Sequence, residues 1–386
     1  MDSTSSGKLK QDVWRYIFEV IVDEAESSDV VLPLLLVCKE WKVIALPLLY
    51  RYLHFYQPTS IIECQPTLVR HGIRGAYPGN STRSIELNVD TSWPGTIAPR
   101  LGKLLRYTPL LKRFHSPMFG VGTDILDILG QSCGSSLKQL DIAIGGKNTD
   151  VTLQVALVTR FTSLRTLGIH LLNMVQSHSI DTPAFDMPSL RRLSLRCSNE
   201  QPSEFIHFFC GGSFVALDYL SLHIRYFSGQ HLEHTTRPAV LRLLEKLGHQ
   251  LSILELHIPQ AEDVARLLFP LLKAVRYMEL LNTLPNDIGR FLPASVNELK
   301  LYINMQDAPH MQALLQCLDN LRDTKQKTHA LEVVYLQSWA ASEPFHWSTI
   351  STLNPALAGH LMTMSIGLQL KDIKLLDNDG KCVMLG

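Results

Sequence analysis

The sequence predicts an α/β solenoid preceded by a short helical module. Three observations lead to this prediction: a repeated apolar motif, helix-forming segments between its copies, and a first segment that lies outside the pattern. The motif is apolar-x-x-apolar-x-apolar, and its clearest copies start at Leu137, Leu164, Leu190 and Leu217, at intervals of 27, 26 and 27 residues. A period in this range, with one short strand per unit, is typical of leucine-rich repeats, whose stacked units bury a shared core.

Weaker copies of the motif extend the pattern in both directions. They start at Thr82, Leu111, Leu251, Val275, Val296, Leu331 and, most weakly, Leu370. The later intervals are uneven, and the asparagine that follows the strand in regular repeats is matched only by Asn304. We therefore expect an irregular leucine-rich-repeat solenoid, with parallel strands on the concave face and helices on the convex face. The alternative is an ordinary α/β domain whose strands share Leu-x-x-Leu.

The segments between the strands favour amphipathic helices. Thr123–Gly130 has an aspartate near its start and a glycine at its end, and Arg237–Gly248 has a proline in its first turn and ends on a glycine. These are helix start and stop signals. Ala261–Phe269 and Met311–Leu318 fit the same role. Each unit is thus expected to contain a strand, a turn, a helix and a second turn.

The first 55 residues do not carry the motif. Asp12 is placed to cap a helix with apolar residues at positions 13, 14, 17, 18, 20 and 21. A break at Ser27–Asp29 precedes a second apolar run, Val31–Cys38, and a third segment, Lys39–Leu53. The pattern predicts about three short helices. So small a bundle buries little surface, and we expect it to leave apolar side chains for a partner.

This module resembles the F-box family. The resemblance lies in Asp12–Glu19, in Leu36–Trp41 with its Val-Cys-Lys-x-Trp element, and in Ala45–Arg51. It implies that the module docks on a Skp-type adaptor held by a cullin scaffold. It also implies that the repeats select a protein substrate for ubiquitin transfer, and that the chain itself is not catalytic.

One departure from the family pattern concerns the Leu-Pro pair that commonly opens an F-box. Lys8–Gln11 stands in its place, so Leu9 alone can supply the apolar anchor. A lost contact of this kind weakens adaptor binding without necessarily abolishing it. The alternative function is therefore a repeat-based binding scaffold whose degenerate F-box recruits no ligase.

The resemblance and the apolar pattern together give a predicted adaptor-binding set. Burial of each large apolar anchor contributes roughly 1.5–3 kcal/mol. The set comprises Val13, Trp14, Ile17, Phe18, Leu34, Leu35, Val37, Cys38 and Trp41. For Trp14, Phe18 and Trp41 the alternative is that they fill the core of the bundle.

The composition restricts the partners and the compartment. The chain has 36 basic and 36 acidic residues, and this balance gives no basic field that would attract nucleic acid. The amino terminus lacks the apolar segment of a signal peptide, and no apolar run is long enough to span a bilayer. Seven scattered cysteines without a Cys-x-x-Cys pair indicate a reducing compartment, the cytosol or the nucleus.

Three short motifs suggest enzyme or ligand chemistry, but none has the required context. Gly130–Gly134 matches Gly-x-Ser-x-Gly, yet a helical segment precedes it and a strand follows, the reverse of a nucleophile elbow. His231 and His234 lack a third metal ligand at a helical spacing. Gly120–Gly122 lacks the third glycine of a dinucleotide loop. We expect no enzyme activity, metal or cofactor.

Substrate binding is expected on the concave strand positions, because side chains alternate between the two faces of a strand. The tentative substrate-binding set is His170, Arg192, Arg196, Tyr219, His223, His257, Tyr277 and Tyr302. Arginine, tyrosine and histidine offer contact area and directed hydrogen bonds at interfaces. We hypothesise that His170 to His257 form part of a strip that recognises an acidic or phosphate-bearing protein segment. The alternative is a solvated sheet face without a ligand.

The domain boundaries follow from these patterns. Residues 1–56 are expected to form the helical module and 81–386 the repeat domain. The prolines and glycines of residues 57–80 predict a hinge between them, partly packed through Ile61, Ile62, Leu68 and Val69.

Overall fold

The computed structural model describes residues 3–73, 77–88, 97–145, 151–172, 184–197, 202–224, 236–258, 264–281, 283–285, 287–324, 330–339 and 344–383. The chain divides into two compact units. Unit 1 comprises Met1–His178, Phe185–Leu190 and Ser213–Val215, and unit 2 comprises Ser179–Ala184, Arg191–Gly212 and Ala216–Gly386. Each unit is described separately.

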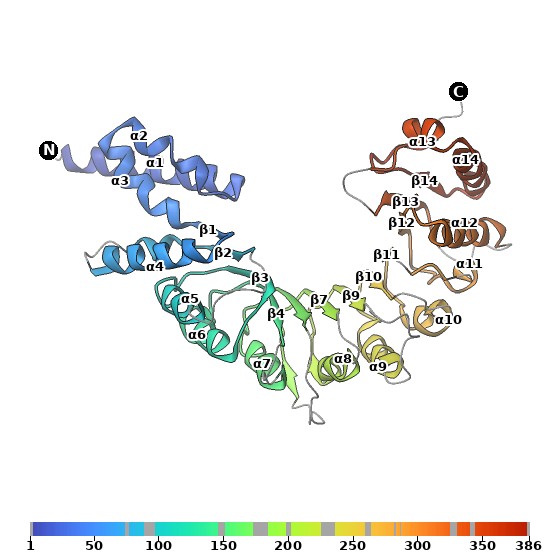
Figure 1. Ribbon diagram of the computed structural model, residues 1–386, viewed down its shortest axis with the longest axis horizontal. Coiled ribbons are helices and arrows are strands. Elements are labelled where there is room, and N and C mark those ends of the chain that lie inside the picture. Colours follow the sequence, from blue (N-terminus) through green and yellow to red (C-terminus); the bar gives the residue numbers. More distant parts are fainter. Residues whose placement is uncertain are drawn as a thin grey trace. The chain divides into compact units, whose positions relative to one another are not determined.

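Unit 1 begins with a helical module (Figure 1). Its elements are α1 (Ser3–Ala25), η1 (Asp29–Val31), α2 (Leu34–Val37), α3 (Lys39–Ala45) and η2 (Leu46–Tyr50). The break predicted at Ser27–Asp29 is present, and Glu26 has a positive φ of 45° where α1 ends. The prediction that Asp12 caps the first helix is wrong, because α1 begins nine residues earlier and Asp12 lies inside it, 3.8 Å from Arg15.

The module has its own small core. Its fully buried residues are Phe18, Val22, Val31, Ile44, Ala45 and Leu48. Trp14, Phe18 and Val22 are four residues apart, so they lie on one side of α1 and face α3. The rings of Trp14 and Phe18 each lie 4.8 Å from the ring of Trp41 on α3. Aromatic packing of this kind fixes α1 against α3.

The repeat units of unit 1 contribute parallel strands. These are β1 (Tyr52–Phe55), β2 (Ser84–Leu87), β3 (Arg113–Gly120), β4 (Gln139–Ile144) and β5 (Thr166–Leu171), each paired with the next. Between them lie α4 (Pro58–Ile73), η3 (Pro78–Ser81), α5 (Ile97–Arg106), α6 (Thr123–Cys133) and α7 (Val151–Val158). Figure 1 shows these helices along one side of the strands. The predicted array of parallel strands with intervening helices is confirmed here.

The motif leucines are the reason that these units stack. In register across the strands lie Leu53, Ile85, Phe114, Leu140 and Leu167, all of them buried. A strand has its side chains alternately on its two faces, so this row points toward the helices and the intervening residues point away. The core of unit 1 therefore runs from strand to strand instead of closing within one unit.

The array begins earlier than predicted. Strand β1 pairs with β2, and its residues follow Tyr50 as Tyr50-x-x-Leu53-x-Phe55, an unrecognised copy of the motif. Residues 58–73 form α4, and its Ile61 and Leu68 are fully buried. The predicted hinge over 57–80 is thus replaced by a repeat unit. Proline was misleading because Pro58 starts α4 and Pro66 is accommodated inside it.

Unit 2 repeats the arrangement (Figure 1). Its parallel strands, in order of pairing, are β7 (Arg192–Cys197), β9 (Tyr219–Ile224), β10 (Ile253–His257), β11 (Tyr277–Leu280), β12 (Glu298–Ile303), β13 (Val333–Ser338) and β14 (Lys374–Leu376). Its helices are α8 (Pro202–Cys210), α9 (Thr236–Leu247), α10 (Val264–Leu268), η4 (Phe269–Leu271), α11 (Ile288–Phe291), α12 (Ala308–Asp323), α13 (Trp347–Leu353) and α14 (Pro355–Gln369). Outside this array, two short strands form a separate two-stranded sheet: β6 (Phe185–Asp186), which belongs to unit 1, and β8 (Gly212–Ser213), which spans the division between the units.

The last unit differs from its prediction. The copy of the motif placed at Leu370 is two residues out of register, because Leu375 pairs with Val334 of β13. Leu370 itself is 84% exposed at the end of α14. Because α14 runs to Gln369, the strand β14 starts only at Lys374. The residue just before this strand, Ile373, is buried.

Candidate functional site

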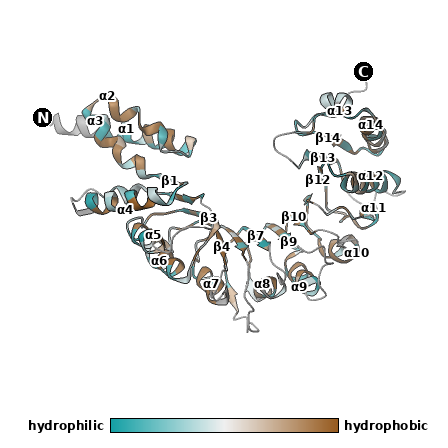
Figure 2. Ribbon diagram, viewed as in Figure 1, coloured by the Kyte–Doolittle hydropathy of each residue, from teal (hydrophilic) through white to brown (hydrophobic). Residues whose placement is uncertain are grey.

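Two kinds of surface stand out: apolar side chains on the helical module, and polar clusters on the strand faces opposite the helices. On the module, α1 has the exposed apolar residues Val13, Tyr16, Ile17 and Ile21, next to the face whose Phe18 and Val22 are buried in the module core. Leu32, Leu36 and Val37 continue the apolar surface in and around α2, and Figure 2 shows hydrophobic residues over these elements. Leu36 is 87% exposed, whereas leucine is one of the residue types most often buried in folded proteins.

The predicted adaptor-binding residues fall into three groups. Val13, Ile17, Val37 and Cys38 are exposed. Trp14, Leu34, Leu35 and Trp41 are half-buried against the module core. Phe18 is only 1% exposed, so its assignment as a direct contact is wrong: its ring fills the core between α1 and α3.

Several exposed apolar residues were missed from the sequence. Leu36 and Val43 are 87% and 75% exposed, and Tyr16, Ile21 and Leu32 are exposed as well. The signal was present in the helical spacing of α1, where 13, 17 and 21 are four residues apart. On α2, a continuous apolar run gives no indication of which side faces outward.

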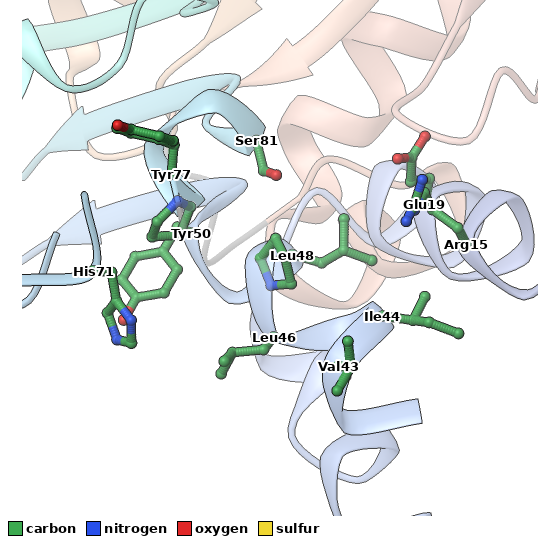
Figure 3. A pocket seen from close by; sticks show the side chains of 12 residues that line it. Arg15, Glu19, Val43, Ile44, Leu46, Leu48, Tyr50, His71, Tyr77 and Ser81 are labelled. Atoms are coloured by element: carbon green, nitrogen blue, oxygen red, sulfur yellow. The ribbon is translucent and has the colours of Figure 1, made fainter. Parts of the chain in front are cut away.

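A pocket of about 350 Å³ lies beside this surface, within unit 1 (Figure 3). Arg15 and Glu19 of α1 lie on one side of it, and Tyr50, His71 and Tyr77 on the other. Its remaining lining residues are Val43, Ile44, Leu46, Pro47, Leu48, Pro78 and Ser81. The module and the first repeat unit both contribute to its walls.

An ion-pair clasp holds α1 to the start of the repeats. The buried Arg51, just before β1, donates from Nε and Nη2 to the two carboxylate oxygens of Asp23, both at 2.6 Å. The Tyr52 hydroxyl donates to the same carboxylate at 3.0 Å. Burial raises the pKa of Asp23, but hydrogen bonds from Arg51 and Tyr52 outweigh it and hold the pKa below its usual value. Bidentate arginine–carboxylate pairs fix geometry as well as contribute energy.

In unit 1, the face opposite the helices carries a row of alternating imidazoles and carboxylates. His54, Glu86, His115 and Asp141 are in register on β1 to β4. His54 Nδ1 lies 2.9 Å from Glu86, and His115 Nδ1 lies 3.1 Å from Asp141. His170 of the predicted substrate-binding set reaches the other oxygen of Asp141, with Nε2 at 3.1 Å. The row is therefore internally paired.

Asp141 is the centre of this row. Burial alone would raise its pKa, and the imidazoles of His115 and His170 outweigh burial, so the pKa lies well below its usual range. The next strand has Gly168 at the same register position. A Cβ there would lie 2.4 Å from Asp141 Oδ1, so glycine gives the carboxylate its space.

In unit 2, the corresponding face holds the other seven predicted substrate-binding residues. On β7, Arg192 and Arg196 are exposed, and the Arg192 guanidinium lies over the Tyr219 ring at 5.4 Å. On β11 and β12, the hydroxyls of Tyr277 and Tyr302 both donate to Glu279, and Lys300 Nζ lies 3.2 Å from it. Burial and the Glu279 carboxylate raise the pKa of both tyrosines well above the usual range, so both remain protonated donors.

His257 does not fit its predicted role as a contact. Its exposed fraction is 3%, since it packs between His223, at 5.4 Å, and Trp339, at 5.8 Å between ring centroids. Trp339 also contacts Tyr302, at 6.2 Å, and it is itself exposed. Trp339 was missed because it follows β13 directly, outside the strand positions considered. The buried ring of His257 thus packs against the rings of this aromatic cluster and helps to hold them in place.

The described residues bring together no group of histidine, cysteine, aspartate and glutamate arranged to hold a metal ion. Ser132 of the Gly-x-Ser-x-Gly match lies inside α6, so it has the wrong setting for a nucleophile elbow. His231 and His234 lie outside the described residues. Within the part of the chain that the structure covers, no helix combines the length and apolar content needed to cross a bilayer.

Comparisons with known proteins give little beyond the geometry. No family model and no curated protein matches the chain. Among solved structures, the chain is similar to the functional domain of InlJ from Listeria monocytogenes, which is described as including a cysteine ladder. The identity is 13%, the match covers 69% of this chain and 57% of that chain, and the TM-score is 0.28. The chain thus matches little more than half the length of that domain, at a similarity that carries no functional argument.

Proposed function

We propose that the chain is a non-catalytic substrate receptor of a Skp–cullin–F-box ubiquitin ligase. The helical module binds a Skp-type adaptor and, through it, a cullin. The repeats bind a protein substrate with the strand faces opposite the helices. The reducing cytosol or nucleus, where such ligases work, suits the free cysteines.

One observation carries the adaptor part of the proposal. The module already has a filled core, yet Val13, Ile17, Leu36, Val37 and Val43 remain exposed around it. Several exposed apolar side chains on a small module with a filled core favour an interaction site. The resemblance to the F-box family names the partner, and the exposed residues fall within or next to the segments that carry the resemblance.

The test is capture of purified adaptor by the purified chain. Substituting Ile17→Asp together with Val37→Asp places two carboxylates in the proposed interface. Each loses an anchor of roughly 1.5–3 kcal/mol, so the affinity should fall by about 100-fold or more. The matched control is Leu370→Asp, which changes an apolar residue of unit 2 that is even more exposed than Ile17 and Val37. Capture by the control should equal that of the unmodified chain.

A second candidate is a repeat-based binding scaffold with a degenerate F-box. It is favoured by Lys8–Gln11, where the family has Leu-Pro, and this segment continues α1 without a break. Failure of the unmodified chain to capture adaptor, with circular dichroism showing a folded protein, would replace the first proposal by this one.

A further inference from the structure

The strand face opposite the helices in unit 2 is divided by charge. The side chains that β7 and β9 present there are Arg192, Ser194, Arg196, Tyr219, Ser221 and His223. They include two arginines and no carboxylate. The next three strands, β10 to β12, present Glu255, Glu279 and Glu298 with Lys300 as their cation. One end of this face is therefore basic and the neighbouring part acidic.

Among the described residues, the arginines of the basic end have no acidic partner. Arg192 and Arg196 are both exposed, and within the described residues neither forms an ion pair with a carboxylate. They project from the same face of β7, on either side of Ser194, and His223 is the register partner of Arg196. Two guanidinium groups around a hydroxyl offer a partner anion several hydrogen bonds at once.

In the part of the chain that the structure describes, the nearest carboxylate of the acidic part also has no cation paired with it. Glu255 lies in register with Ser221 on one side and with Glu279 on the other. Glu279 is neutralised by Lys300 at 3.2 Å and receives two tyrosine hydroxyls. The half-buried Glu255 receives the Tyr219 hydroxyl, but none of the described cations pairs with it. A half-buried carboxylate beside a second one is a favourable site for a partner cation.

Aromatic rings surround this carboxylate. Tyr219 and Tyr277 are on the two neighbouring strands, both in register with Ile253, two residues before Glu255. The chain already places its own cations on such rings, Arg192 on Tyr219 at 5.4 Å and Lys300 on Tyr302 at 5.1 Å. A guanidinium or ammonium group over Glu255 would gain both an ion pair and contact with ring faces.

We propose that this face binds an extended polypeptide segment that carries one acidic and one basic side chain, with two residues between them. Strands β7 and β10 are separated by β9, so their side chains are about 10 Å apart at a spacing of about 4.8 Å per strand. A peptide in the extended polyproline II conformation advances about 3.1 Å per residue and completes a turn every three residues, so two side chains three positions apart lie on the same side, about 9 Å from each other. The acidic group lies over Arg192 and Arg196, and the basic group over Glu255. The inference names the substrate class of the receptor proposed above and rests on this face being its binding surface.

The experiment is a selection from a display library of ten-residue peptides against the purified full chain. The library fixes one glutamate and one arginine, in both orders, with zero to five residues between them, and varies the other positions. Peptides with two intervening residues should be enriched above all other spacings. A synthetic peptide from that class should lose about fivefold or more in affinity when either its glutamate or its arginine is replaced by alanine.

Variants of the chain then assign each charge to its site. Arg192→Ala with Arg196→Ala should abolish the preference for the peptide glutamate and leave the preference for its arginine. Glu255→Gln should do the reverse. Glu245→Gln, an exposed carboxylate on α9, is the matched control and should change neither preference. Thermal unfolding of each variant establishes that it is folded.

Three outcomes would overturn the inference: no enrichment over the support alone, enrichment independent of charge and spacing, or preferences that the three substitutions leave intact. The selection uses no adaptor. A chain that captures adaptor but shows one of these outcomes would retain the proposed function and lose this substrate class. A chain that selects the peptides without capturing adaptor would retain this binding preference and lose the proposed function.

Discussion

At the scale of single residues, Asp141 shows how the strand face of unit 1 is held in order. Its carboxylate is shared by His115 and His170, each at 3.1 Å, and occupies space that a side chain at position 168 would fill. The pairing needs contributions from three strands, β3, β4 and β5. Local substitutions in this row should therefore have effects that depend on one another.

Replacing Asp141 by asparagine should lower the free energy of unfolding by about 2 kcal/mol near pH 6, because hydrogen bonds to a charged group are lost. The folded-state pKa of Asp141 is depressed below its ordinary value of 3.8. Its contribution is therefore complete above that value and decreases as the pH falls through the folded-state pKa. Urea unfolding of both proteins at pH 6 and pH 3 should show the difference narrowing at pH 3. A difference that grows on acidification would contradict this account.

Gly168→Ala should destabilise unit 1 by about 1–3 kcal/mol, the usual cost of inserting a methyl group into filled space. The added Cβ would lie 2.4 Å from Asp141 Oδ1 and 2.8 Å from its Cγ, so the short side chain has to move. In an Asp141→Ala background the same substitution should cost much less. Unfolding of the two single variants and the double variant measures this coupling. Strict additivity would show that the clash is absent.

At the scale of secondary-structure elements, ion pairs of unequal burial join α1 and the residue just beyond it to the repeats at two places, Arg51 and Arg113. The first is the clasp of Arg51 with Asp23, in which the arginine is buried. The second joins Glu26, just beyond α1, to the more exposed Arg113 of β3, with Nη1 to Oε2 at 3.0 Å. An exposed pair contributes little because water screens it.

Arg51→Ala should consequently destabilise the protein more than Arg113→Ala. Loss of the buried guanidinium leaves the Asp23 carboxylate without its two hydrogen bonds from Arg51, with only the Tyr52 hydroxyl still donating to it, at a cost of about 1–3 kcal/mol. The exposed Arg113 pair is worth about 0.2–1 kcal/mol. Chemical denaturation of the two variants, read out by tryptophan fluorescence of the module, makes the comparison. Equal losses, or a larger one for Arg113→Ala, would show that the clasp does not anchor α1.

The strands and their helices were predictable because a repeated apolar row leaves a periodic trace in the sequence. Leu140, Leu167 and Leu193 recur at the positions that the stacked core demands. The first unit was missed because its copy begins with Tyr50 and lies among helix-forming residues, and α4 was taken for a hinge because it contains two prolines.

The apolar anchors of the module could be named from the sequence, but which of them face the core and which face outward could not. Phe18 and Ile17 are neighbours, and only the packing of α1 on α3 decides that one is buried and the other exposed. The charge division of unit 2 was also hidden, because it depends on strand pairing and on which charges neutralise each other.

At the scale of the whole molecule, the cysteines report on packing in both units. Cys38 and Cys382 are exposed, while Cys133 in unit 1 and Cys197 and Cys317 in unit 2 are buried. Burial raises the pKa of Cys133 and of Cys317 to about 12, so these thiols are protected both by access and by protonation.

Alkylation with iodoacetamide at pH 8 should label Cys38 and Cys382 in the native chain within minutes. Labelling of Cys133, Cys197 and Cys317 should require denaturant. Mass spectrometry of peptides after timed quenching measures each site separately. Bound adaptor should in addition slow the reaction of Cys38, which lies in the proposed interface, and leave Cys382 unchanged. Rapid native labelling of Cys197 would contradict the packing of β7.

The first strand follows the helical module after a single residue, Arg51, and the segment once expected to be a hinge is a helix of the array. No flexible linker therefore separates the module from the first strand. A protein bound to the strands of unit 1 would therefore lie at a fixed distance from a partner bound at Leu36 and Val37. For the substrate receptor proposed above, this fixed distance would determine which lysines of the bound protein can be modified.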